Sequence, residues 1–154
     1  QSAKWFIEAL NQRYNTLNKT MNAIIEYQRK FFEDGEENDL KPMILKDIAE
    51  IIKMDISTVS RIVSSKVVQT DFGVFPLKYF FSESTIMKGK EYVSSKVVKN
   101  FLKDLINNEN KEKPLSDELL EKKLKVEGFK VARRTVAKYR EQLNIPVARL
   151  RKEY

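Results

Sequence analysis

Cysteine and histidine are both absent from the 154 residues of this sequence. Zinc sites built from thiolate or imidazole ligands are therefore excluded, and so are Ser-His and Cys-His nucleophile pairs. Disulfide bonds are excluded too, which favours a cytoplasmic protein. No apolar run reaches the roughly 18 residues that suggest a membrane span, so we expect no membrane partner. The sequence thus predicts no catalytic residues, no metal and no cofactor.

Glycine and proline are scarce, with four of each, so long loops and β-rich turn networks are not expected. The fold class predicted is all-α. The net charge is +7, and residues 115–154 hold 11 basic against 6 acidic residues, a local net charge of +5. A basic excess gathered in one region is typical of a surface that binds nucleic acid. A lysine-rich surface on an ordinary soluble domain would give the same count.

Residues 3–32 carry apolar side chains at helical spacing and predict one long helix, which ends in the acidic, glycine-containing loop 33–39. Its apolar stripe needs a partner element, which we expect other helices of the same protein to supply. Because the sequence begins inside this helix and without Met, we expect a fragment of a longer protein.

Residues 45–66 predict two short helices with a break at 53–55, the pattern of a helix-turn-helix. An ordinary helical hairpin is the alternative. Short hydroxyl side chains and one arginine are expected to point outward from the second helix, as suits a DNA groove: Ser57, Ser60, Arg61 and Ser64.

The aromatic segment 70–82 is expected to pack back as a short hairpin or an extended strand. Helical spacing returns at Glu91, with a cap at Ser94 or Ser95, and a polar loop follows at 107–114. A further helix is predicted to begin after the N-cap Ser116 and to end at Gly128. The stretch 131–143 would then be the third helix of this unit and the second half of another helix-turn-helix.

On a helical wheel of residues 131–143, Val136 and Tyr139 lie on the buried stripe, together with Ala132 and Leu143. Arg134 lies on the opposite side, near the helix start, where an arginine can donate two hydrogen bonds to guanine. Arg133 and Arg140 are expected to lie together on one flank. Cations and hydroxyls around Arg134 are expected to hold phosphates: Lys130, Arg133, Thr135, Lys138 and Arg140. A merely solvated basic face is the alternative.

The decapeptide ARRTVAKYRE, 132–141, matches residue for residue the signature called the RpoN box. The sequence therefore resembles the bacterial sigma-54 class of alternative sigma factors. Four more blocks agree with this family in order: WFIEALNQRYNTL, LKDIAEIIKMDISTVSRIVSSKVVQT, FPLKYFFS and PLSDELL. The resemblance covers essentially the whole chain.

The resemblance implies a promoter-binding role together with core RNA polymerase, at promoters opened by an ATP-hydrolysing activator. The RpoN-box helix would read the GG of the −24 element, and the first helix-turn-helix would face the GC of the −12 element through Arg61. Residues 1–42 would end the core-binding domain, 43–86 would form the central helix-turn-helix, and 87–154 would form the RpoN-box domain. The activator-responsive glutamine-rich region of the family is not in this sequence.

Two stretches depart from the family pattern. Asp71-Phe72-Gly73 stands where relatives often have Pro-Arg before the glycine, so a basic contact is not expected there. The ending IPVARLRKEY keeps Arg149, Arg151 and Lys152 but lacks serines that could contact phosphate.

Two other classes of protein fit parts of the pattern. A phage or plasmid repressor could also carry two helix-turn-helix units, but the RpoN box disfavours it. A transposase or recombinase would need a carboxylate cluster, for which 33–39 is the only dense acidic run.

Overall fold

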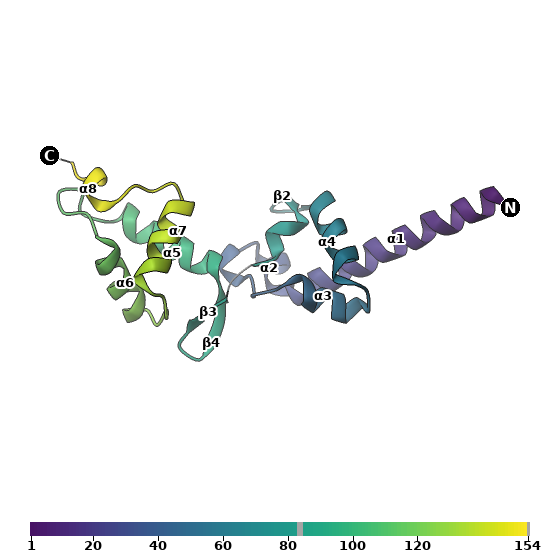
Figure 1. Cartoon of the computed structure of the whole chain (residues 1–154), viewed down its shortest axis with the longest axis horizontal. Coiled ribbons are helices and arrows are strands. Elements are labelled where there is room, and N and C mark those ends of the chain that lie inside the picture. The colour runs from purple at the N-terminus through teal and green to yellow at the C-terminus, as the bar shows by residue number, and fades with distance from the viewer. Residues whose placement is uncertain (83–84, 154) are drawn as a thin grey trace. The chain divides into compact units, whose positions relative to one another are not determined.

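The computed structural model describes residues 1–82 and 85–153, and the chain forms two compact units, Gln1–Ser82 and Glu83–Tyr154 (Figure 1). Each unit has its own hydrophobic core. The boundary expected at residue 42 lies inside the first unit, and the one expected at residue 86 lies within a strand of the second. The division into three parts by function stays a prediction.

The first unit begins with α1 (Ser2–Tyr27), which is followed after one residue by α2 (Arg29–Asp34). The single helix predicted over 3–32 is therefore interrupted at Gln28. The buried amide of Gln28 donates hydrogen bonds to the carbonyl oxygens of Lys41 (2.8 Å) and Phe80 (3.1 Å) and accepts one from the Lys41 N–H (2.8 Å). These contacts with distant segments accompany a departure of Gln28 from helical angles (φ −102°, ψ 29°).

The two halves of α1 differ in their surroundings. The C-terminal half packs against the core through Thr20, Ala23 and Ile24. Large apolar side chains nearer the start of the helix are exposed: Trp5, Phe6, Ile7, Leu10 and Tyr14. The predicted apolar stripe is thus covered along one half of its length.

The core of the first unit is aromatic around Phe31. The ring centroid of Phe31 lies 5.4 to 5.6 Å from those of Phe32, Phe75 and Phe80. Gly35 ends α2 in the left-handed conformation (φ 75°), and a Cβ there would lie 2.4 Å from the Phe72 ring. Glycine is therefore required by both the backbone angle and the space.

Two short helices follow the 3-10 turn η1 (Glu37–Asp39). They are α3 (Leu45–Ile52) and α4 (Ile56–Ser65), separated by a left-handed residue at Lys53 (φ 55°). Ile48, Val59 and Val63 are buried where the two helices pack on the core. These bounds match the predicted helix pair and its break at 53–55.

A hairpin and a 3-10 turn complete the first unit, and they resolve the form of segment 70–82. Strand β1 (Val67–Thr70) pairs antiparallel with β2 (Gly73–Pro76), and η2 (Leu77–Phe80) follows. The Thr70 hydroxyl closes the turn, donating to the Gly73 carbonyl (2.8 Å) and accepting from the Phe72 N–H (3.2 Å). The hairpin prediction is therefore confirmed in part, because the first strand lies mostly before residue 70 and residues 77–80 form the 3-10 turn.

The second unit opens with another antiparallel hairpin, β3 (Thr85–Lys88) with β4 (Glu91–Ser94). Its helices are α5 (Ser95–Asn107), α6 (Asp117–Val126), α7 (Arg133–Gln142) and the short α8 (Ala148–Arg151). The predicted caps hold, because Ser94 Oγ accepts from the Lys96 N–H (3.3 Å) and Ser116 Oγ from the Leu119 N–H (3.3 Å).

The all-α prediction is wrong in part, because the mostly helical chain also contains the two hairpins. The helix expected from Glu91 starts four residues later, at Ser95, and Val93 lies in a strand. Gly89 explains the second hairpin. It occupies the first position of a two-residue turn at positive φ (62°), a conformation that glycine favours and that matches the twist of paired strands.

Candidate nucleic-acid interface

The turn before α7 determines where that helix starts. Gly128 adopts a positive φ (89°) after α6, and the Phe129 N–H donates to the Leu124 carbonyl (3.0 Å). Phe129 and Val131 are then buried, at 2% and 3% exposure. They anchor the chain on the core immediately before the helix begins.

The buried stripe of α7 agrees with the helical wheel at its centre. Val136 and Tyr139 are buried and Leu143 is half-buried, whereas Ala132 is exposed because it is the residue preceding the first turn. Four basic side chains are exposed along α7 or just before its first turn, and we name them the α7 cations: Lys130, Arg133, Arg134 and Lys138. Thr135 is half-buried.

Arg133 lies close to the first turn of α6. The pKa of Glu118 is lowered, first by a hydrogen bond from Lys122 and to a smaller extent by the charge of Arg133. Arg133 therefore has an acidic neighbour within its own domain. Arg134 is exposed and lies on the side of α7 opposite the buried Val136 and Tyr139.

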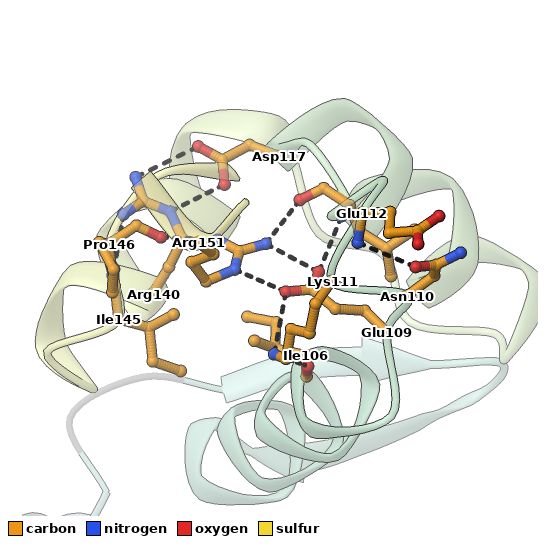
Figure 2. A network of polar contacts seen from close by, with 11 residues as sticks. Ile106, Glu109, Asn110, Lys111, Glu112, Asp117, Arg140, Ile145, Pro146 and Arg151 are labelled. Atoms are coloured by element: carbon orange, nitrogen blue, oxygen red, sulfur yellow. Dashed lines mark hydrogen bonds and ion pairs between the residues drawn. The ribbon is translucent and has the colours of Figure 1, made fainter. Parts of the chain in front are cut away.

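The expected exposed pair of Arg133 and Arg140 is wrong, because Arg140 is buried, with 4% of its surface accessible. Its guanidinium donates from Nε to Asp117 Oδ1 (2.9 Å), from Nη2 to Asp117 Oδ2 (3.3 Å) and from Nη1 to the Ile145 carbonyl (2.8 Å) (Figure 2). Asp117 at the start of α6 and the segment after α7 together cover this flank. The donors expected to hold a phosphate are used inside the domain.

The side chain of a second arginine, Arg151, is also enclosed within the fold, with 6% of its surface exposed. Arg151, in α8, donates from Nε to Glu109 Oε1 (2.7 Å) and from Nη2 to Glu109 Oε2 (2.9 Å) (Figure 2). It also donates to the carbonyls of Leu115 (2.8 Å) and Pro146 (2.6 Å). Glu109 lies in a polar loop 42 residues before Arg151, and no local sequence pattern indicates that the two residues pair.

The Glu109 carboxylate is fully enclosed, with a side-chain exposure of 0%. Burial acts to raise its pKa, but the hydrogen bonds from Arg151 and the Leu115 N–H outweigh burial and hold the pKa below its ordinary value. The charged form is therefore stabilised inside the fold. We call Glu109, Leu115 and Arg151 the C-terminal clamp, because they fix α8 to the loop between α5 and α6.

In the first unit, α4 carries the residues predicted to face the −12 element. Ser57, Arg61 and Ser64 are exposed and Ser60 is half-buried, as the predicted outward face requires. Arg61 lines an open groove of about 1050 Å³ between α4 and the exposed half of α1. Other basic groups share this groove: Arg13, Lys53 and Lys66.

The acidic run 33–39 does not form a metal cluster. Its member Asp39 is paired with Lys30, and Gly35 turns the chain between α2 and η1. Within residues 1–82 and 85–153, no three His, Cys, Asp or Glu side chains meet as a possible metal site. Among the helices of these same residues, none has the length and apolar character needed to cross a bilayer.

An exposed cationic helix held on a small helical core is typical of the class of helical DNA-binding domains. A family model described as "Sigma-54, DNA binding domain" matches residues 1–153. The chain belongs to the sigma-54 DNA-binding domain family.

Two relatives and one solved structure illustrate the similarity. The chain is 47% identical over 152 residues to the RNA polymerase sigma-54 factor of Shewanella violacea, covering 99% of this chain and 31% of that protein. It is 46% identical over 153 residues to the Escherichia coli factor, covering 99% and 32%. The crystal structure of Aquifex aeolicus sigmaN bound to promoter DNA matches with a TM-score of 0.66 and 39% identity, covering 97% of this chain and 44% of that one. The chain thus spans about a third of the length of these two relatives.

Proposed function

We propose that this chain is the promoter-binding part of a sigma-54-class factor, which directs core RNA polymerase to promoters opened by an ATP-hydrolysing activator. The observation that carries the proposal is the exposed set of α7 cations on the RpoN-box helix, in a chain similar to a sigmaN bound to promoter DNA. The activator would act through regions outside this chain. The protein would bind DNA rather than catalyse a reaction.

In this proposal α6 and α7 form a helix-turn-helix, and α7 is the recognition helix for the −24 element. Arg134 would donate two hydrogen bonds to a guanine, since it is exposed near the helix start and lies away from the buried Val136 and Tyr139. Lys130, Arg133, Thr135 and Lys138 would contact phosphates and fix the register. Arg140 is left out of this set because its donors are engaged by Asp117 and Ile145.

The pair α3 and α4 would form the other helix-turn-helix, directed at the −12 element through Ser57, Ser60, Arg61 and Ser64. The exposure of Arg61 beside other basic groups supports this assignment. Residues 1–42 would contribute to core polymerase binding, for which the exposed Trp5 and its apolar neighbours on α1 are suited. The three functional parts 1–42, 43–86 and 87–154 belong to this proposal.

Replacing Arg134 with alanine tests the central assignment. Loss of a bidentate contact to guanine should weaken binding to a GG duplex by about 1–3 kcal/mol and flatten discrimination against substituted bases. The matched control is Lys138→Ala, which should weaken all duplexes nearly alike. Both are measured by fluorescence anisotropy on GG and substituted duplexes at fixed salt. An Arg134 variant that prefers GG as strongly as the parent would contradict the assignment.

Replacing Arg61 with alanine tests the proposed contact between α4 and the −12 element independently. We expect protection of the −12 element in a footprint to weaken, by about 1–3 kcal/mol in site affinity, while the −24 contacts persist. Arg134→Ala should give the opposite pattern on the same duplex. Equal losses at both elements from Arg61→Ala would instead indicate a folding defect or a single composite site.

A further inference from the structure

The hairpin of β3 and β4 is joined by its backbone to the turn that precedes α7. The Lys130 N–H donates to the Met87 carbonyl (2.9 Å), and the Gly89 N–H donates to the Gly128 carbonyl (3.0 Å). Between these bonds Lys88 forms an antiparallel bridge with Phe129. The hairpin tip is therefore positioned by the same residues that position the start of α7.

The tip of this hairpin is cationic and exposed. Lys88 and Lys90 are both exposed, and the Lys88 ammonium lies 4.8 Å from the centroid of the buried Phe129 ring. Such a cation–π contact holds the charge at a defined place on the surface. On the outer face of β4, Tyr92 is 63% exposed, so its hydroxyl is available to an external acceptor.

Acidic groups also lie nearby, and they limit the local charge. Glu91 pairs with Lys88 across the hairpin, and Glu127 precedes the turn at Gly128. The net charge of this region is +1, because Glu91 and Glu127 offset two of the three lysines Lys88, Lys90 and Lys130. Arg133 and Arg134 on α7 add to this positive charge. The cationic surface of the α7 start thus continues onto the hairpin.

We propose that the β3–β4 hairpin is a wing that contacts the DNA backbone beside the element bound by α7, through Lys88, Lys90 and Tyr92. This inference rests on the proposed function. A recognition helix enters a major groove about 12 Å wide with its N-terminal residues deepest, so phosphate ridges flank that end closely. A two-stranded ribbon tied to that end, with strands about 4.8 Å apart, reaches across such a ridge.

The charges that the wing contributes can be removed without disturbing the core. Lys88→Gln keeps an aliphatic stem over Phe129, and Lys90 lies in the two-residue turn. A parent that neutralises roughly six phosphates should show a slope of log affinity against log salt near −5. The double variant Lys88→Gln with Lys90→Ala should have a slope shallower by about two units. At 0.1 M salt the same rule gives a loss of roughly eightfold per lysine, equal on GG and substituted duplexes.

Two controls accompany the double variant. Lys113→Ala removes an exposed lysine from the loop beyond the far end of α5, a 13-residue helix of about 20 Å, and should leave the slope unchanged. The double variant Lys88→Arg with Lys90→Arg keeps both charges and should bind like the parent. If the Lys88→Gln/Lys90→Ala variant keeps the parent's slope, the proposal that the hairpin contacts DNA is wrong.

Phosphate neutralisation locates the contact directly. Single methylphosphonates are placed along the duplex flanking the GG, and binding of the parent and of the Lys88→Gln/Lys90→Ala variant of the full chain is compared. We expect one or two flanking positions at which neutralisation weakens the parent several-fold and leaves the variant unaffected. Equal losses of affinity for both proteins at every position would contradict the proposal that the hairpin contacts the DNA backbone. If the parent itself fails to distinguish GG, or Arg134→Ala changes nothing, the proposed function fails instead.

Discussion

Arg151→Met should destabilise the second unit by about 3–5 kcal/mol, because it leaves the Glu109 carboxylate buried without its main partner. Glu109 has a side-chain exposure of 0%, and Arg151 supplies two of its hydrogen bonds. Lys111 Nζ, 3.5 Å from Glu109 Oε1, replaces little of this interaction. The measurement is urea unfolding followed by circular dichroism, with amide hydrogen exchange in α5 reporting on the second unit.

The matched control is Arg149→Met, which makes the same chemical change two residues away at an exposed position. A second variant, Arg151→Met with Glu109→Gln, removes the stranded charge and keeps an acceptor for the Leu115 N–H. It should recover more than half of the loss, since a buried charge without a partner costs more than a missing pair. If Arg151→Met shifts stability no more than Arg149→Met, the C-terminal clamp does not stabilise the fold.

The pH dependence of the clamp follows from the lowered pKa of Glu109. A carboxyl whose pKa is lower in the folded state stabilises the fold above its unfolded pKa, near 4.5, and this contribution is lost as pH falls below that value. The parent should therefore lose stability more steeply below about pH 4.5 than the variant carrying both Arg151→Met and Glu109→Gln. Parallel curves for the two proteins would contradict this expectation.

Arg140→Ala should also destabilise the second unit, by about 2–3 kcal/mol, through lost charge-assisted hydrogen bonds rather than through lost DNA contact. The guanidinium joins Asp117 at the start of α6 to the Ile145 carbonyl after the end of α7. Arg140→Lys should recover little of this loss, since an ammonium cannot reproduce the planar arrangement of donors. Thermal unfolding of the variants measures the effect.

DNA binding measured on the folded protein distinguishes a structural role of Arg140 from a direct contact with DNA. At a temperature where Arg140→Ala is fully folded, we expect the salt slope of DNA binding to match that of the parent. Lys138→Ala provides the converse control, with parental stability and a slope shallower by about one unit. A shallower slope for folded Arg140→Ala would indicate that Arg140 contacts DNA after all.

The local sequence determined much of the helical layout. Helical spacing together with Ser116 and Gly128 predicted α6, and the turn at 53–55 predicted the boundary between α3 and α4. These features depend on residues a few positions apart, so local side-chain chemistry specifies them. The RpoN box likewise identified α7, and the wheel oriented Arg134 away from Val136 and Tyr139.

Tertiary structure decided which cations are available to a partner. A helical wheel gives angles about one axis, but it cannot tell that Asp117 and the segment at Ile145 cover the flank where Arg140 lies. The Arg151 side chain is enclosed for the same reason, since its partner Glu109 comes from a distant loop. The β3–β4 strands are four residues each, too short to be specified by their own propensities, and they form because they pair with each other and with the turn before α7.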